Sequence, residues 1–181
     1  MPSCRVLVLV AVFAGGCARG GLAHDDAASL TPEQIATVFG SAAALDVVRF
    51  SERAQAWRIE SPKKPVAEVS YLDRWKRLSE PVTLAPDVVQ QLVGILERPT
   101  TYSFDRAKGC IFDPGVQLHF VKGEQVVDVL LCFKCKELNV CHNGKRVGGE
   151  DFDNEEPRLV ALVKQIFPQD QAILELQAGS H

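Results

Sequence analysis

Two apolar runs near the middle of the chain, 116–120 and 126–133, stand on either side of a short loop that contains Gly123. Runs of β-branched residues around such a loop are typical of a β-hairpin. Side chains alternate between the faces of a strand, and a turn centred near Gly123 leaves one face of this hairpin entirely apolar. Its residues are Val116, Leu118, Phe120, Val127, Val129, Leu131 and Phe133. We expect this face to be core.

A second hairpin follows directly along the chain. Asn143-Gly144 is the signature of a tight two-residue turn, and it links an apolar run at 138–141 to a short return through Val147. Two successive hairpins predict an antiparallel meander. Further strands are predicted at 46–50 and at 66–72.

Helices are predicted before and after these strands. A capping box at Thr31 begins a short helix that reaches about Gly40. Apolar residues recur at helical spacing over 86–98, and Asn154 is placed to cap a last helix that ends before Pro168. One face of that last helix carries Leu159, Leu162, Val163 and Ile166. This order predicts an α+β fold, an antiparallel sheet with helices packed on one face.

The N-terminus has the features of a bacterial export signal. Residues 1–16 combine one cation, an apolar run too short to cross a bilayer, and small residues at the end. The motif Ala-Gly-Gly-Cys17 resembles a lipobox, which implies that Cys17 becomes the lipidated first residue of the mature chain. Cleavage after Ala23 is the alternative and would release a soluble protein. Residues 17–29 are predicted to tether the anchor to a single domain over 30–181.

Composition excludes several functional classes. With 20 basic and 23 acidic residues the net charge is −3, so nucleic acid is not an expected partner. The chain is 46% apolar and 24% charged, which is typical of a globular protein and excludes disordered, collagenous and polytopic membrane classes. The expected membrane contact is through the lipid anchor.

Four cysteines remain for the domain once Cys4 leaves with the signal and Cys17 is acylated. They are Cys110, Cys132, Cys135 and Cys141. An exported chain meets an oxidising compartment, so structural disulfides are the first interpretation. The predicted hairpin register places Cys135 beside Cys110, and we expect that bridge, with Cys132–Cys141 as the second. A bulge at 114–115 would instead favour Cys132 as the partner of Cys110.

Metal binding and thiol redox chemistry are the alternatives. Cys132 and Cys135 have a common ligand spacing, although a second CxxC is missing. The residues that could complete a tetrahedron are Cys110, Cys141 and His142. A thioredoxin-like site requires a helix directly after its CxxC, whereas 136–149 is charged and rich in turns. Lys136 stands where a c-type haem site requires histidine, which excludes that cofactor, and no cofactor is expected.

The segment C-x-F-x-P at Cys110, Phe112 and Pro114, followed by C-F-x-C at Cys132 and Cys135, resembles a pattern in uncharacterised bacterial exported proteins. The resemblance covers residues from Cys110 to Cys135 and carries no activity. It implies that this hairpin is a unit of a small domain. Cys141 lies outside the shared pattern.

No catalytic group emerges from the remaining residues. Strand alternation points His119 away from the core, as a surface imidazole, and His142 is expected to be a solvated turn residue. The acidic run 150–156 lacks the glycine of a calcium loop and is expected to serve a helix N-terminus. Trp57 and Trp75 lie in a basic, aromatic region, which we interpret as solvated charges around two core tryptophans. A partner or ligand surface, or a face toward anionic lipid, is the alternative.

These patterns together predict an exported, lipid-anchored envelope protein. Its expected role is binding or structural rather than enzymatic. A disulfide is expected to cross-link its central hairpin. The alternative is a metal or thiol-redox protein that uses Cys110, Cys132 and Cys135.

Overall fold

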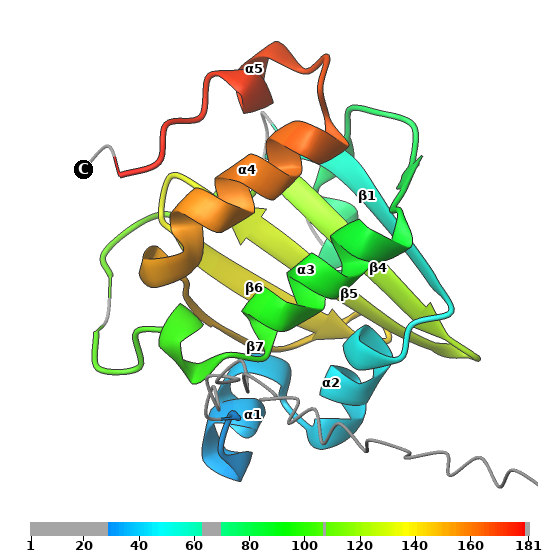
Figure 1. Ribbon diagram of the computed structural model, residues 1–181, viewed down its shortest axis with the longest axis vertical. Helices are drawn as coiled ribbons and strands as arrows, with labels where there is room; N and C mark the ends of the chain where they lie inside the picture. Colours follow the sequence, from blue (N-terminus) through cyan, green and yellow to red (C-terminus); the bar gives the residue numbers. More distant parts are fainter. Residues whose placement is uncertain (1–28, 63–69, 107, 180–181) are drawn as a thin grey trace, which may run out of the picture.

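One antiparallel sheet organises the chain (Figure 1). The computed structural model describes residues 29–62, 70–106 and 108–179. The strands are β1 (Arg53–Glu60), β2 (Lys76–Arg77), β3 (Val82–Thr83), β4 (Val116–Lys122), β5 (Gln125–Cys132), β6 (Glu137–His142) and β7 (Lys145–Asp151). Their order across the sheet is β2-β1-β4-β5-β6-β7, and β3 pairs with β1 beside β2. Chain neighbours from β4 to β7 are therefore sheet neighbours, as a meander requires.

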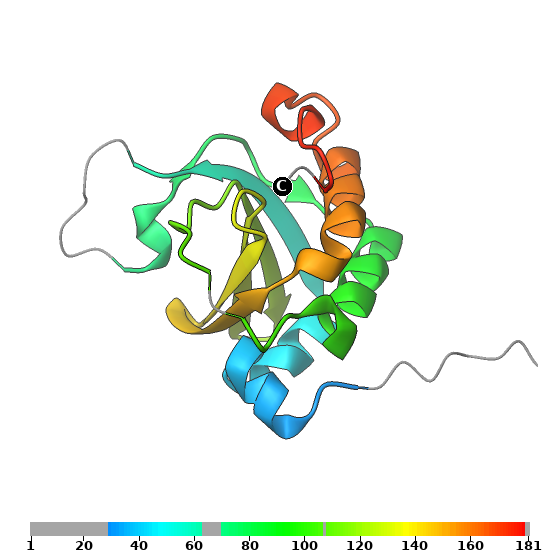
Figure 2. The ribbon, with the colours of Figure 1, turned by 90° about the vertical axis from the view of Figure 1, so that its left-hand side faces the viewer.

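The helices of the described residues gather on one face of this sheet (Figure 2). They are α1 (Pro32–Phe39), α2 (Ala42–Arg49), α3 (Pro86–Leu96), α4 (Glu156–Ile166) and α5 (Gln171–Leu174). The 3-10 turns are η1 (Leu72–Arg74), η2 (Pro99–Thr101) and η3 (Asp153–Glu155). Together with the antiparallel sheet, this confirms the predicted α+β class.

The central hairpin has the predicted faces but not the predicted turn. Val127, Val129 and Leu131 lie in the same buried cluster as the apolar side chains of β4. Lys122 pairs with Gln125, so the turn has two residues and the pairing lies one residue from a turn centred on Gly123. Gly123 has a φ of 55°, a conformation that suits glycine at the first position of such a turn.

The strand predicted at 46–50 is wrong, because those residues end α2. Ser41 caps this helix by accepting a hydrogen bond from the Ala44 amide, and alanines fill its first turn. Helical periodicity then buries Leu45 and Val48 against β4 and β5. The burial of this face outweighs the strand preference of its valines.

Helices α1, α3 and α4 lie where the sequence predicts helices, whereas α5 was not predicted. The Thr31 side chain and Gln34 form the capping box of α1, which ends at Gly40. The predicted face of α4 is buried, but Asn154 is not its cap. The Asn154 amide donates instead to the Thr100 carbonyl 3.0 Å away, because η3 intervenes before the helix begins.

Several predictions fall outside the described residues. These are the export signal, Cys4, Cys17 with most of its tether, and most of the strand predicted at 66–72. Among the residues that the structure does describe, no helix has the length and apolar character needed to cross a membrane.

The second face of the sheet, opposite the helices, is covered by loops (Figure 2). Segments 70–83, 103–106 and 108–115 lie over it, and their apolar side chains pack on those of the sheet. This second cluster contains Trp57, Ile59, Leu130, Tyr71, Leu72, Trp75 and Phe112. The end of β1 and the crossing segment that carries Cys110 thus meet on this face.

Candidate functional site

The predicted bridge between Cys110 and Cys135 is present. The two Cα atoms are 5.8 Å apart, and 25 residues separate the cysteines in sequence. The strand-alternation argument does not account for it, because β5 ends at Cys132 and β4 begins at Val116. Cys135 lies in the loop from β5 to β6, and segment 103–115 carries Cys110 across the second face to reach it.

Lys108, in this crossing segment, binds the loop that carries Cys135 and the acidic run. Its Nζ donates to the Cys135 carbonyl oxygen 3.0 Å away and to Asp153 Oδ2 2.6 Å away. It also lies 3.4 Å from Asp151 Oδ2. Two members of the acidic run therefore bind a lysine here, and only part of that run serves the N-terminus of α4 as expected.

Cys132 is a free thiol in contact with the disulfide loop. Its side chain is buried, and its Sγ accepts hydrogen bonds from the backbone amides of Asp113 and Cys135, each 3.4 Å away. The Cys135 sulfur in turn lies 3.1 Å from the Ile111 carbonyl oxygen. The three cysteines of the predicted motif therefore meet at one corner of the sheet. We call Cys110, Cys132 and Cys135 the cysteine corner.

The second predicted bridge, Cys132–Cys141, is wrong, since both cysteines are free and buried. Cys132 lies opposite Glu137 in the register, and Cys141 lies four residues further along β6. At about 3.4 Å per residue their Cα atoms are roughly 14 Å apart, about twice the reach of a disulfide. Strand geometry keeps Cys141 out of the cysteine corner.

The metal interpretation finds no support in the described residues. The disulfide uses two of the four proposed thiolate ligands. Across 29–62, 70–106 and 108–179 no group of three or more His, Cys, Asp and Glu side chains is placed to hold a metal ion. His142 bonds Gln125 Oε1 at 3.0 Å near the exposed hairpin end, away from the cysteine corner.

Carboxylates line the β6 side of the cysteine corner. Glu137 lies opposite Cys132 on β5 and opposite Asp151 on β7. Burial raises the pKa of Glu137, and the neighbouring Asp151 carboxylate raises it further. Burial likewise raises the pKa of Asp151, although Lys108 opposes this. These side chains border a polar cavity of about 180 Å³.

A polar row crosses the second face, and the sequence alone did not reveal it. His119, Asp128, Cys141 and Arg146 are successive register partners on β4, β5, β6 and β7. Asp128 is 2% exposed and lies 2.7 Å from His119 Nδ1. It also accepts a hydrogen bond of 2.8 Å from the Gln117 amide. The prediction of His119 as a surface imidazole is therefore wrong. The correct hairpin register, which pairs His119 with Asp128, would have predicted this row.

The polar row does not form a nucleophile and base pair. Asp128 stands between His119 and Cys141, which lie two strands apart, a separation of about 10 Å. Burial raises the pKa of the Cys141 thiol to about 12, and the Asp128 carboxylate adds to this. A protonated, buried thiol at that distance cannot be activated by the imidazole. The hydrogen bonds of this row join His119 and Gln117 to Asp128 within the sheet.

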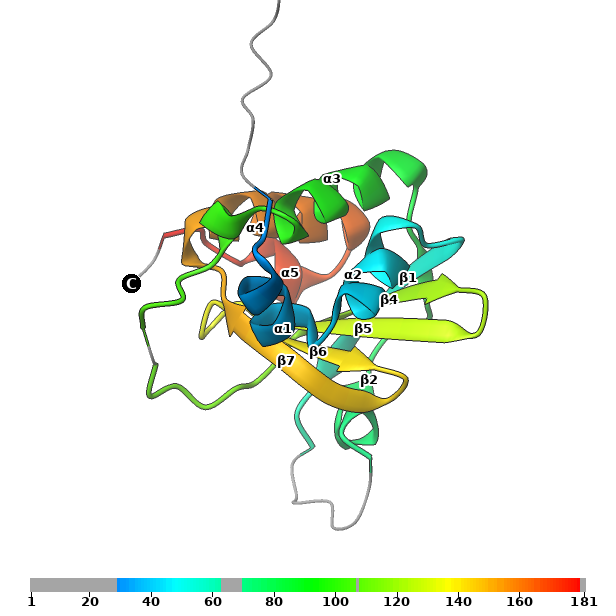
Figure 3. The ribbon, with the colours of Figure 1, turned by 90° about the horizontal axis from the view of Figure 1, so that it is seen from below.

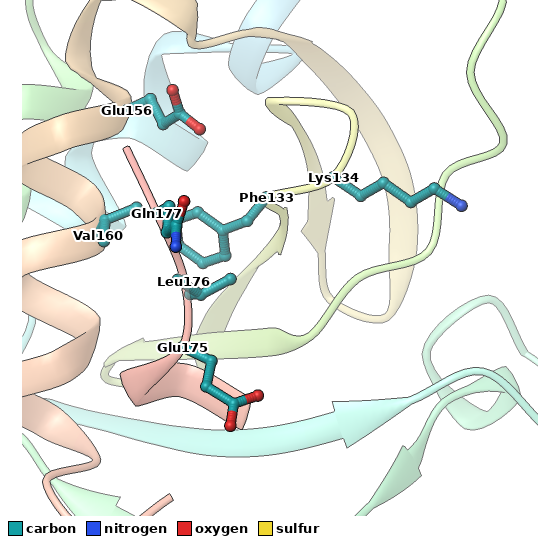
Figure 4. A pocket seen from close by; sticks show the side chains of 7 residues that line it. All are labelled: Phe133, Lys134, Glu156, Val160, Glu175, Leu176 and Gln177. Atoms are coloured by element: carbon teal, nitrogen blue, oxygen red, sulfur yellow. The ribbon is translucent and has the colours of Figure 1, made fainter. Parts of the chain in front are cut away.

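A cavity of about 310 Å³ lies on the other side of the β5–β6 loop (Figure 4). The Phe133 ring, Val160 and Leu176 provide its apolar wall, while the Lys134 ammonium points away from them. Glu156 stands at one end and binds Lys136 Nζ at 2.9 Å, so its charge is already paired. The cavity lies between α4 and the C-terminal segment, whose Glu175 and Gln177 side chains also line it.

The two tryptophans of the basic region lie in the second cluster. Trp57 is buried, and the Arg77 guanidinium stands 4.2 Å from its ring centroid. Trp75 packs edge-on against Tyr71 and Phe112. This agrees with the interpretation of charges around packed tryptophans.

Comparison with protein-family models, with curated proteins and with solved structures found no match.

Proposed function

We propose that this protein is an exported, lipid-anchored component of the bacterial cell envelope, with a binding or structural role rather than a catalytic one. The Cys110–Cys135 disulfide is the observation that carries the proposal. Disulfides persist in oxidising compartments and are rare in the bacterial cytosol. Support for export therefore comes from the folded domain as well as from the signal-like sequence of residues 1–16.

Two further features support a non-catalytic role. The His119 imidazole lies about 10 Å from the Cys141 thiol of the polar row, and the disulfide links a long loop to the sheet. A cross-link that spans 25 residues stabilises a fold by about 3 kcal/mol, because it lowers the conformational entropy of the unfolded chain. The likeness of the hairpin to exported bacterial proteins stays a prediction that agrees with this role.

The proposal is tested by expressing the full chain in a Gram-negative host and weighing the intact protein from separated membrane and soluble fractions. We expect a membrane-bound chain that begins at Cys17 and carries the added mass of a lipid. Reduction should raise the mass by about 2 Da, the signature of one disulfide. The Cys17→Ser variant is the matched control and should lose the lipid mass.

Two outcomes would count against the proposal in different ways. A soluble chain that begins after Ala23 would reject the anchor and keep export. A cytosolic chain with an intact N-terminus and four reduced thiols in the domain would reject export itself.

A further inference from the structure

The cysteine corner holds one disulfide and one thiol in direct contact with the same loop. Cys132 Sγ accepts a hydrogen bond from the Cys135 backbone amide, 3.4 Å away. Covalent geometry then limits the distance between the sulfurs of Cys132 and Cys135 to less than about 8 Å. Cys132 is the last residue of β5, and Cys135 follows within the turn, so their Cα atoms have the spacing of turn ends, about 7 Å or less. That spacing falls in the range of a disulfide.

We propose that Cys132 is an internal nucleophile that exchanges with this disulfide. The Cys132 thiolate attacks the Cys135 sulfur, a Cys132–Cys135 bond forms, and the Cys110–Cys135 bond breaks. Cys110 leaves as a thiolate and takes up a proton from water, which replaces the proton that Cys132 gave to water. One disulfide and one thiol exist before and after the step, so no oxidant or reductant is consumed.

Burial decides which sulfur is attacked. Cys135 is 3% exposed, whereas Cys110 is half-buried and stands next to Ile111, which is 85% exposed. Attack on Cys135 expels Cys110, whose negative charge can be hydrated at the surface. Attack on Cys110 would expel Cys135 as a charge in the protein interior, which is unfavourable. Exchange therefore runs toward a surface thiol at Cys110.

The surroundings of Cys132 favour the attack. Two backbone amides, from Asp113 and Cys135, point at its sulfur and can stabilise the negative charge that it carries during the reaction. Cys141 offers the contrast, since its thiol is equally buried but lies about 14 Å from Cys132 along the strands, away from the disulfide. Exchange is thus expected of Cys132 and not of Cys141.

The product is a site for thiol-directed modification on segment 103–115. A free Cys110 beside the exposed Ile111 would react with a disulfide-bearing polypeptide or with a small thiol reagent. The folded resting state hides this reactivity, because the two free thiols of the described residues, Cys132 and Cys141, are buried.

The test is to incubate the folded full chain, extracted in detergent, with N-ethylmaleimide at pH 8 and to map the cysteines with trypsin. Lys134 separates Cys132 from Cys135, because trypsin cuts between residues 134 and 135. The Cys110–Cys135 bridge links peptides 109–122 and 135–136, whereas the exchanged bridge links 123–134 and 135–136. We expect maleimide on Cys110 to accumulate together with the exchanged bridge.

Cys141 reports global unfolding in the same experiment. Exchange in the folded state labels Cys110 while Cys141 stays unlabelled. Unfolding without exchange instead labels Cys132 and Cys141 together and leaves Cys110 in its bridge. That second pattern would overturn the proposal.

Two variants separate exchange from a folding defect. Cys132→Ser should lower the labelling of Cys110 by at least about tenfold, because the attacking thiolate is gone, whereas the matched Cys141→Ser should leave it unchanged. Cys110→Ser, in a buffer of oxidised glutathione, should form the Cys132–Cys135 bridge. A folded Cys110→Ser protein whose Cys132 and Cys135 stay reduced would overturn the proposal, as would equal labelling of Cys110 in Cys132→Ser and in the unchanged chain.

Discussion

Replacing Gly148 with alanine tests how closely α1 lies on the edge strand β7 (Figure 3). A Cβ atom at Gly148 would stand 2.4 Å from the carbonyl oxygens of both Thr37 and Val38. Both oxygens belong to the backbone of α1, so no side chain can rotate away from the added methyl group. The position fits glycine because of this contact between two backbones.

The expected cost follows from the distance. Restoring an ordinary contact requires β7 and α1 to separate by roughly 1 Å. That movement would loosen the packing of Val38 and Phe39, which are fully buried in the core. Overpacking of a rigid site costs about 1–3 kcal/mol, and the backbone on both sides places Gly148→Ala near the upper end. We expect a loss of about 2–3 kcal/mol and a melting temperature lower by about 5–10 °C.

Urea unfolding followed by tryptophan fluorescence measures this change, since Trp57 is buried in the folded protein. Gly94→Ala is the matched control, because a Cβ at Gly94 meets nothing within 4 Å and the residue lies inside α3. The same methyl group should there stabilise the protein by about 0.5–1 kcal/mol. The two variants are expected to have opposite signs.

A Gly148→Ala protein with the same stability as the unchanged protein, and the same dependence of unfolding free energy on urea, would contradict this close contact between β7 and α1. A loss of equal size in Gly94→Ala would also contradict this contact. The destabilisation would then come from replacing glycine by alanine in general and not from contact with α1.

Three more substitutions test the electrostatics of the structure. Asp128→Ala leaves a buried amide and an imidazole without their acceptor, and should cost about 2 kcal/mol or more in urea unfolding; an unchanged midpoint would contradict the buried network. Because burial raises the pKa of Glu137 above 4.5, the folded protein holds that proton more tightly, so unfolding free energy should fall as the pH rises from 4.5 through the folded pKa. In Glu137→Gln the unfolding free energy should depend less on pH between pH 5 and 7, and the same pH dependence as in the unchanged protein would contradict the raised pKa of Glu137. Lys136→Met leaves the buried Glu156 unpaired and should cost about 3 kcal/mol, whereas the exposed Lys145→Met should cost little; equal effects would show that the pair contributes nothing.

The sequence predicted a helix correctly where neighbouring residues carried both a cap and an apolar periodicity, or one of them clearly. The capping box at Thr31 and the apolar periodicity of 86–98 predicted α1 and α3 because both signals involve neighbours in sequence. At 46–50 the local preference of two valines pointed to a strand, but the helical face of α2 buries against β4 and β5. A contact with strands 70 residues further along the chain is invisible to local propensity.

The cysteine corner was predicted in part. Its three members were named, and one bridge was correct, although Cys110 and Cys135 meet through loops and not through the strand pairing from which the bridge was predicted. The bridge proposed for Cys132 and Cys141 failed because both lie in register on β5 and β6, about 14 Å apart along the strands. Proximity in sequence was mistaken there for proximity in space.

The sequence by itself determined the meander, its buried face and the presence of α1, α3 and α4, because strand alternation, turn residues, caps and helical periodicity act over short stretches of sequence. The tertiary structure decided the rest. It set the register of the hairpin to one residue, and with it the polar row of His119, Asp128 and Cys141. It also placed the segment that carries Cys110 over the second face, where Cys132 meets the disulfide loop. Both outcomes depend on contacts between strands and loops far apart in the chain, and such contacts follow from the packing of the whole sheet.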